Sequence, residues 1–332
     1  MGSPFYGFIL DRLARGEDGG AVLEMLRHRP ADEDPFGAAI VLRLMACTHR
    51  LALTNVAPQL AAHYPSCGGD GDVEKAWFAL NATIAEHKET IQCELDVPPQ
   101  TNEVGRAAAL IGGFLLIAKR YGLPLRLLEI GASAGLMLHW DRFRYETGTW
   151  SWGSVGSAVR LDDHFVGRMP FSSDFHVAIC ERAGCDIAPI DPATKAGRLR
   201  LLSFCWPDQH DRFLRLAAAC EIAQEFPVVI ERAHAWPWIA RELDAVRSGM
   251  TTVVFHTVML QYLDSTERAK LSESLAEAGR RSTLEAPLAY LTLEPQPHRR
   301  ANVLLRLWPD DRELELASAS LHGRDVTWLY GG

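Results

Sequence analysis

Residues 126–138 read Arg-Leu-Leu-Glu-Ile-Gly-Ala-Ser-Ala-Gly-Leu-Met-Leu, an apolar strand that runs into a turn of small residues and then into an apolar helix. Gly131 and Gly135 carry no Cβ, so the backbone can turn sharply there and approach a ligand closely. A helix that starts directly after such a turn presents unpaired N–H groups. The stretch therefore predicts a small-ligand site at the end of a β-strand, with Glu129 just before the turn.

Strands and helices alternate after this stretch, and such alternation favours a mostly parallel sheet with helices on both faces. The expected strands are 125–130, 176–181, 227–231, 251–256, 286–293, 302–308 and 312–318, and the expected helices are 102–121, 135–144, 208–224, 235–247 and 265–280. Only residues 309–311 separate the last two strands, so these must pair antiparallel. The predicted fold is therefore α/β, with a mostly parallel sheet and a C-terminal antiparallel hairpin.

A chain of 332 residues exceeds the usual size of one domain, so we expect a larger domain and a smaller one. Between about residues 5 and 95 the apolar residues recur at helical spacing, which predicts an N-terminal helical subdomain over 1–100. The α/β domain then occupies 101–332. Residues 145–173 contain Gly, Ser and Trp in a pattern that fits no helix, and they are predicted to form a flap, either a lid or a packed surface excursion.

The composition argues against several classes of function. Lys and Arg number 34 against 42 Asp and Glu, a net charge of −8 without a long basic run, so duplex nucleic acid is not an expected partner. The longest apolar run, residues 107–118, is shorter than the ~20 residues that cross a bilayer, so no membrane span is expected. The seven cysteines form no Cys-x-x-Cys pair and no secretory pattern is seen, which indicates the cytoplasm. The spacing His-Glu-x-x-His is absent, and no metal site is predicted.

The glycine turn has three interpretations. A dinucleotide fingerprint would read G-x-G-x-x-G, whereas this turn has Ser133 and Leu136 at the second and third glycine positions. Residues 131–135 satisfy the nucleophile-elbow pattern G-x-S-x-G between a strand and a helix, which is typical of a serine hydrolase. Such hydrolases place several strands before the elbow, but the region upstream here has a helical pattern. The third interpretation is a nucleotide-type turn at the first strand of the sheet.

The third interpretation includes a resemblance to a known family. The order of strand, turn and helix, with a final antiparallel hairpin, resembles the class I S-adenosylmethionine-dependent methyltransferases, whose first motif runs roughly E/D-x-G-x-G-x-G. Glu129, Gly131 and Gly135 match this motif, and Ser133 replaces its central glycine. The resemblance implies a methyltransferase-like, Rossmann-type sheet, S-adenosylmethionine as cofactor and a small-molecule substrate. The alternative is that the same glycines serve only the packing of the helix on the sheet.

A closer resemblance spans nearly the whole chain. Thr-Asn-Glu-Val-Gly-Arg at 101–106, the turn at 129–136, Cys-Trp-Pro-Asp-Gln at 205–209 and Phe-His-Thr at 255–257 are similar to an uncharacterised bacterial domain-of-unknown-function family. That family has no established activity. The resemblance therefore implies the methyltransferase-like fold without supplying a substrate or a reaction.

Polar residues at the carboxyl ends of the strands are the candidate site residues, because ligands of doubly wound sheets bind there. Glu181 is expected to end the second strand, where methyltransferase-like folds use an acid to bind ribose hydroxyls, and Asp186 is the competing choice. Glu231 is expected to end the third strand and to face the adenine side. The predicted cofactor-binding residues are Glu129, Gly131, Ala132, Ser133, Gly135, Glu181 and Glu231.

His256 ends the most apolar strand, where an acceptor substrate would lie against the reactive methyl group, so it is the predicted catalytic residue. A histidine side chain can accept a proton near neutral pH, and general-base help of this kind is worth about 10²–10⁴ in rate. The alternative is a buried ring bonded to nearby backbone. The predicted pocket residues are Asn102, Glu103 and Arg106, before the first strand, and Gln261 and Tyr262, after the fourth.

The sequence therefore predicts an S-adenosylmethionine-dependent methyltransferase that acts on a small molecule. Two alternatives remain open. One is a serine hydrolase that uses Ser133 with His256 as base, which a fluorophosphonate would label. The other is a non-catalytic module that binds a metabolite or a protein partner without turnover.

Overall fold

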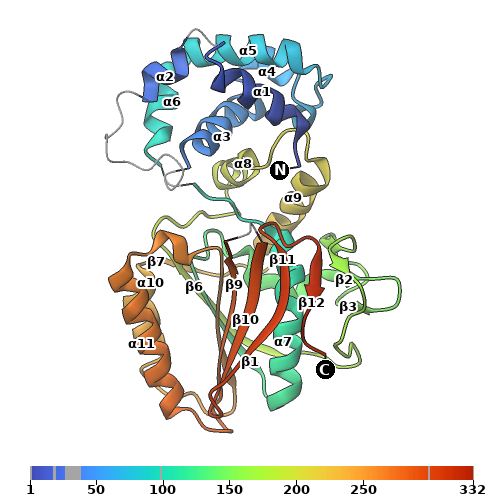
Figure 1. Ribbon diagram of the computed structural model, residues 1–332, viewed down its shortest axis with the longest axis vertical. Coiled ribbons are helices and arrows are strands. Elements are labelled where there is room, and N and C mark those ends of the chain that lie inside the picture. Colours follow the sequence, from blue (N-terminus) through green and yellow to red (C-terminus); the bar gives the residue numbers. More distant parts are fainter. Residues whose placement is uncertain (1, 18–19, 27–38, 98, 298–299, 332) are drawn as a thin grey trace. The chain divides into compact units, whose positions relative to one another are not determined.

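The computed structural model of the protein (Figure 1) describes residues 2–17, 20–26, 39–97, 99–297 and 300–331. The chain divides into two compact units. A helical unit contains Met1–Thr101 and Asp191–Ala217, and an α/β unit contains Asn102–Ile190 and Ala218–Gly332. Residues 191–217, which the sequence pattern assigned to the α/β domain, therefore group with the helices.

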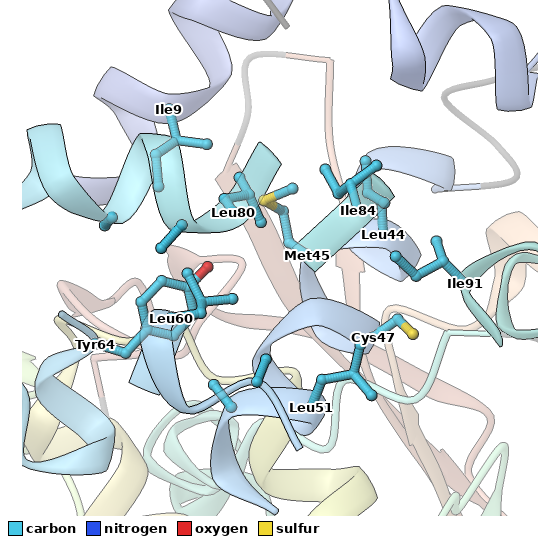
Figure 2. Packing of buried hydrophobic residues seen from close by; sticks show 14 of the residues in the cluster. Ile9, Leu44, Met45, Cys47, Leu51, Leu60, Tyr64, Leu80, Ile84 and Ile91 are labelled. Carbon is cyan, nitrogen blue, oxygen red and sulfur yellow. The ribbon is translucent and has the colours of Figure 1, made fainter. Parts of the chain in front are cut away.

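The helical unit consists of short helices around one apolar core. Its helices are α1 (Pro4–Ala14), α2 (Ala21–Leu26), α3 (Ile40–Leu53), α4 (Pro58–Ala61), α5 (Val73–Glu86), α6 (Lys88–Leu95) and α8 (Lys195–Ser203), with the 3-10 helix η1 (Pro65–Cys67). Ser3 and Asp72 cap α1 and α5, because each side chain accepts a hydrogen bond from the backbone N–H three residues later. Figure 2 shows Met45 of α3 packed beside Leu80 of α5 in this core. Helix α9 (His210–Glu225) contains the boundary between the two units.

The α/β unit is built on a nine-stranded sheet with the order β5-β12-β11-β10-β9-β8-β1-β6-β7. Its strands are β1 (Leu125–Ile130), β5 (Phe165–Val166), β6 (Ile179–Asp186), β7 (Ile230–Arg232), β8 (Thr251–Thr257), β9 (Leu288–Pro295), β10 (Arg300–Trp308), β11 (Arg312–Ser320) and β12 (Val326–Trp328). Strands β7, β6, β1, β8 and β9 pair in parallel, whereas β9 to β12 pair antiparallel. The predicted mostly parallel sheet and the closing hairpin are therefore present.

Strand β1 lies at the centre of the parallel part of the sheet. The next strands along the chain, β6 and β7, lie on one side of it, and β8 and β9 lie on the other. This is the order of a doubly wound sheet, in which ligands bind where the direction of strand addition reverses. That switch point lies between the carboxyl ends of β1 and β8, so the glycine turn after β1 lies at the expected place.

Helices cover both faces of the sheet (Figure 1). Because side chains alternate along a strand, Val254 and Phe255 of β8 point to opposite faces. Val254 packs with α10 (Ala235–Glu242) and α11 (Ser265–Arg281). Phe255 lies on the other face, where its ring centroid is 5.3 Å from that of Phe114 in α7 (Ala107–Tyr121). None of the helices in the described part of the chain is long and apolar enough to span a bilayer.

The second parallel strand differs from its prediction. The apolar residues 177–180 indicated a strand over 176–181, but β6 runs from Ile179 to Asp186. Its interior contains Glu181 and Arg182, and both are ion-paired, to Arg126 and Asp141 respectively. Because these charged side chains are ion-paired, the strand can contain them. A prediction that follows only apolar residues misses such a strand.

The segment after the glycine turn is a kinked 3-10 helix, η3 (Leu136–Arg142), rather than the predicted helix 135–144. Non-helical backbone angles at His139 mark the kink. Arg182 donates a hydrogen bond to the carbonyl oxygen of Leu138, which an α-helix would use for the N–H four residues later. The turn is therefore not followed by an α-helix whose dipole could hold an anion.

The predicted flap is a small three-stranded sheet with the order β3-β2-β4. Its strands are β2 (Arg144–Glu146), β3 (Ser151–Trp152) and β4 (Arg160–Leu161), and β2 and β3 form a hairpin. The ring of Trp152 stacks on that of Trp140 with centroids 5.3 Å apart. The flap is thus anchored to η3 by an aromatic stack.

Candidate functional site

The turn after β1 is held to the end of β6 by hydrogen bonds. The N–H of Ser133 donates to Asp186 Oδ2 at 2.9 Å, and the N–H of Ala132 donates to the carbonyl of Cys185 at 2.9 Å. Ser133 has a φ of 54°, a left-handed value that L residues rarely adopt, and these bonds hold it there. Asp186 ends β6 and fixes the turn, so it occupies the position predicted for Glu181.

Side chains of the protein cover both glycines of the turn. At Gly131 an added Cβ would overlap Cγ of Met259, and at Gly135 it would lie 2.6 Å from Cδ1 of Ile230. The glycines are therefore needed for close packing as well as for their φ values of 66° and 69°. A ligand that approaches Gly131 from this side must displace the Met259 side chain.

Gly131→Ala is expected to lower the free energy of unfolding by about 2–5 kcal/mol. The left-handed backbone contributes about 1–2 kcal/mol of this loss and the overlap with Met259 about 1–3 kcal/mol. Urea denaturation measures the change. Gly122→Ala is the matched control, because Gly122 has a φ of 64° and no atom within 4 Å of an added Cβ. Equal losses in the two variants would contradict the contact between Gly131 and Met259.

Glu129 at the end of β1 is a buried carboxyl group that lacks a full set of partners. It is 3% exposed, and its Oε2 makes no hydrogen bond within the described residues. Burial, together with the charge of Asp186, raises the pKa of Glu129 well above its ordinary value. Buried polar atoms are normally hydrogen-bonded, so this carboxyl group is suited to bind a ligand amine or hydroxyl.

Three more buried polar atoms near the turn have no hydrogen-bond partner among the described residues. They are Ser133 Oγ, His139 Nδ1 and Trp140 Nε1. Burial, with a contribution from the positive charge of Arg182, lowers the pKa of His139 to about 4. His139 is therefore neutral at physiological pH. The segment from Glu129 to Trp140 thus offers both hydrogen-bond donors and acceptors to a ligand.

The two other predicted cofactor acids lie in ion pairs. Glu181 lies near the amino end of β6, where its Oε1 accepts from Nε of Arg126 at 2.9 Å. It is thus at the end of the strand opposite to the glycine turn, and the predicted position was wrong. Glu231 of β7 is exposed, and Arg241 lowers the pKa of its carboxyl group by two hydrogen bonds of 3.0 and 2.6 Å.

His256 is fully buried on β8 between two side chains of β9. Its Nδ1 lies 2.7 Å from Glu294 Oε1, and its Nε2 lies 2.6 Å from the hydroxyl of Tyr290. Burial and the charge of Glu294 raise the pKa of Tyr290, so its hydroxyl stays protonated and donates to Nε2. Glu294 also accepts the N–H of Met259 at 2.9 Å. His256 therefore positions the loop that carries Met259, and neither ring nitrogen is available to a substrate in this arrangement.

Of the predicted pocket residues before the first strand, Arg106 lies at the carboxyl end of β8. Arg106, in the 3-10 helix η2 (Val104–Arg106), donates through Nη1 to Thr257 Oγ1 at 3.3 Å. It also donates through Nε to the carbonyl of Leu321 at 2.9 Å. Asn102 Nδ2 is buried, and no described residue accepts from it. Arg106 therefore lies at the sheet edge where a ligand is expected.

Glu103 forms a carboxylate–imidazole pair that the sequence did not indicate. The carboxylate is 3% exposed, and its Oε2 lies 3.0 Å from Nδ1 of His322, whose side chain is 51% exposed. His322 lies on the turn after β11 and is 219 residues from Glu103 in the chain. The buried Glu103 carboxylate thus fixes the orientation of a half-exposed imidazole ring.

The predicted residues after the fourth strand are at the surface. Gln261 and Tyr262 belong to the 3-10 helix η4 (Leu260–Tyr262), and both are exposed. The loop before them contains Val258, a β-branched residue with a φ of 52°. Such residues rarely adopt left-handed angles, so this loop stores backbone strain next to Met259.

The structure does not bring together the pair that a serine hydrolase needs. Ser133 Oγ bonds to no described residue, whereas both ring nitrogens of His256 are bonded to β9 side chains. The described residues also contain no cluster of three or more His, Cys, Asp or Glu side chains arranged to hold a metal ion.

Sequence reasoning missed four residues of this site. Asp186 was considered only as the alternative to Glu181 for the acid at the end of the second strand. A correct prediction of where β6 ends would have selected it. Glu294 interrupts an apolar strand, and Met259 follows the strand of His256, so both offered a weak signal. His322 offered none, because only the fold brings it to Glu103.

Comparisons with known proteins identify one family. The sequence pattern of a family described as uncharacterized protein conserved in bacteria (DUF2332) matches residues 1–328. No curated protein and no solved structure matches the chain.

Proposed function

We propose that this chain, which belongs to the bacterial family DUF2332, binds S-adenosylmethionine beyond the carboxyl end of β1 and transfers its methyl group to a small molecule. The observation that supports this proposal is the buried carboxyl group of Glu129 at the switch point of a doubly wound sheet, whose Oε2 bonds to none of the described residues. A ligand with an ammonium and hydroxyl groups suits such an acceptor.

The residues near the turn fit this cofactor in part. Glu129 would accept from an ammonium or a hydroxyl, and Ser133 and His139 would supply further hydrogen bonds. When bound, S-adenosylmethionine supplies an electrophilic methyl group on a sulfonium ion. Met259 must rotate away from Gly131 to admit the ligand, and its unbranched side chain has the freedom to do so.

His322 would accept the proton that the methyl acceptor loses. Glu103 holds Nδ1 of the ring at 3.0 Å, which leaves Nε2 for the acceptor. We therefore assign the role of general base to His322 and a positioning role to His256. Arg106 and Asn102 would orient the acceptor between the ends of β8 and β11.

Titration calorimetry with S-adenosylmethionine, and with its demethylated product, tests the proposal. The wild type is expected to bind both, and Glu129→Gln neither. Glu231→Gln is the matched control, because Glu231 is an exposed acid on a neighbouring strand. A thermal-shift assay gives a second readout, since a ligand at 100 times its dissociation constant stabilises the folded state by ~2.7 kcal/mol. No heat and no shift at millimolar ligand would refute the proposal.

A non-catalytic binding module is the second candidate, and the packing of Met259 and Ile230 against the turn glycines favours it. Such a module would bind a ligand with the same affinity in the wild type and in His322→Gln, and neither protein would release methylated product. The serine hydrolase is not favoured, because no described residue bonds to Ser133 Oγ and both ring nitrogens of His256 are bonded elsewhere. If a fluorophosphonate labelled the wild type and not Ser133→Ala, the protein would be a serine hydrolase after all.

A further inference from the structure

A cavity of about 380 Å³ lies in the α/β unit, and none of its lining residues belongs to the turn after β1. It is bounded by the C-terminal half of α7, the β10–β11 hairpin and residues 170–175. Small-molecule pockets have volumes of roughly 300–1,000 Å³, so this cavity can hold a small ligand.

The walls of the cavity are apolar. The side chains that form them are Leu115, Leu116, Leu307, Leu314, Phe171, Phe175 and Tyr330. The rings of Phe171 and Tyr330 are parallel, with an interplanar angle of 3° and centroids 6.0 Å apart. Gly112 of α7 makes room for this wall, because an added Cβ would overlap the ring of Phe171. An apolar chain would thus lie between leucines and aromatic rings.

The rim of the cavity is positively charged. Lys119, Arg120 and Arg312 line it, and no Asp or Glu of the described residues does. Arg120 is paired with Asp310, whereas Lys119 and Arg312 form no ion pair within the described parts of the chain. In a chain with a net charge of −8, this is a local reversal of charge.

The position of the cations points to a ligand rather than to the helix alone. Lys119 and Arg120 lie in the last turn of α7, where cations also stabilise the negative end of the helix dipole. Arg312 is different, because it comes from the start of β11. Cations from two elements therefore meet at the mouth of one apolar cavity.

We propose that this cavity binds a medium-chain fatty carboxylate. The alkyl chain lies between the leucines of α7, β10 and β11 and the Phe171–Tyr330 pair, and the carboxylate lies at Lys119 and Arg312. Burial of the chain provides affinity, and the cations at the rim select an anionic head group over a neutral one. This site is separate from the one proposed at Glu129.

Binding of decanoate and of decanol, measured by calorimetry on the full chain, tests the proposal. Decanoate is expected to bind with a stoichiometry of one and at least tenfold more tightly than decanol. The double variant Lys119→Gln/Arg312→Gln is expected to lose at least tenfold in affinity for decanoate and to bind decanol unchanged. Equal affinities for decanoate and decanol, or no binding of either at millimolar concentration, would refute the proposal.

Two controls separate this site from general effects of charge and from the site at Glu129. Arg247→Gln/Arg280→Gln removes the same net charge at exposed positions that do not line the cavity, and it should leave decanoate binding unchanged. Leu116→Trp should fill the cavity and abolish binding of both probes, with an unchanged thermal midpoint as proof of folding. Glu129→Gln should bind decanoate as the wild type does. A loss of binding in Arg247→Gln/Arg280→Gln as large as in the rim variant would show that only net charge matters.

Discussion

Glu129→Gln is expected to make the ligand-free protein more stable than the wild type at pH 8. Burial and the charge of Asp186 raise the pKa of the Glu129 carboxyl group well above its ordinary value of 4.5. Glutamine has nearly the same shape, and it removes the cost of ionising a buried group. Each tenfold change in proton affinity between the folded and unfolded states corresponds to about 1.4 kcal/mol.

The pH dependence gives the sign of this effect. Because the folded state binds the Glu129 proton more tightly than the unfolded state, protonation of Glu129 favours the folded state of the wild type, and this contribution is fully present below pH 4.5. That contribution is lost as the pH rises from 4.5 toward the raised pKa of the folded protein. The difference in unfolding free energy between variant and wild type should therefore grow from near zero at pH 4 to its full value above the raised pKa. Chemical denaturation at a series of pH values measures it.

Ligand should reverse the order of stability. If Glu129 pairs with a ligand ammonium, removal of its charge costs on the order of 100-fold in affinity, as for one partner of a buried charge pair. The wild type should then gain stability from S-adenosylmethionine and Glu129→Gln should not. Glu231→Gln should show neither effect, because Arg241 lowers the pKa of that exposed carboxyl group instead. A variant less stable than the wild type at pH 8 would show that Glu129 is bonded within the protein.

Arg126→Met is expected to lower the free energy of unfolding by about 1–3 kcal/mol, because the hydrogen bonds of a buried guanidinium group are lost. The Arg126 side chain is 1% exposed on the central strand β1. It donates to Glu181 Oε1 at 2.9 Å, and to Glu242 Oε2 at 2.5 Å and the Glu242 carbonyl at 3.1 Å. Its removal leaves two carboxylates facing each other without their shared cation. Urea denaturation measures the loss.

A triple variant tests whether the charges themselves stabilise the fold. In Arg126→Met/Glu181→Met/Glu242→Met no unpaired carboxylate remains, and an apolar replacement of a buried ion cluster is often neutral or stabilising. We expect it to recover most of the stability that Arg126→Met loses. Arg15→Met, which removes a cation from an exposed pair with Asp11 outside this cluster, is the control and should change stability little. An unchanged midpoint in Arg126→Met would show that the cluster contributes nothing.

The strands whose residues are apolar throughout were predictable. β8 was expected over 251–256 and runs from Thr251 to Thr257, since a β-branched, apolar run buried on both faces is a local signal. The predicted bounds of β6 were wrong because its charged residues pair with residues of other elements. A local sequence pattern does not contain those partners. The 3-10 geometry of η3 was missed for the same reason, because Arg182 of β6 takes the Leu138 carbonyl.

The candidate site shows the same division. Glu129 and the glycines were placed correctly at the end of the central strand. Asp186 occupies the position at the end of β6 that was predicted for Glu181, and only the true end of β6 identifies it. His256 was placed correctly at the end of β8, but Tyr290 and Glu294 occupy both of its ring nitrogens. The pairing of Glu103 with His322 joins residues that no motif connects.

By itself the sequence determined that an α/β sheet follows a helical region and that a tight turn ends its first strand. The spacing of apolar residues and the backbone freedom of glycine depend only on residues close together in the chain, so they can be read from the sequence. Only the tertiary structure decided that Met259 covers Gly131 and that Lys119 and Arg312 line one cavity. It also decided that one oxygen of Glu129 is bonded to no residue in the described part of the chain. Those features depend on contacts between segments that are far apart in the sequence. The energies of these contacts come from packing and burial, which exist only in the folded chain.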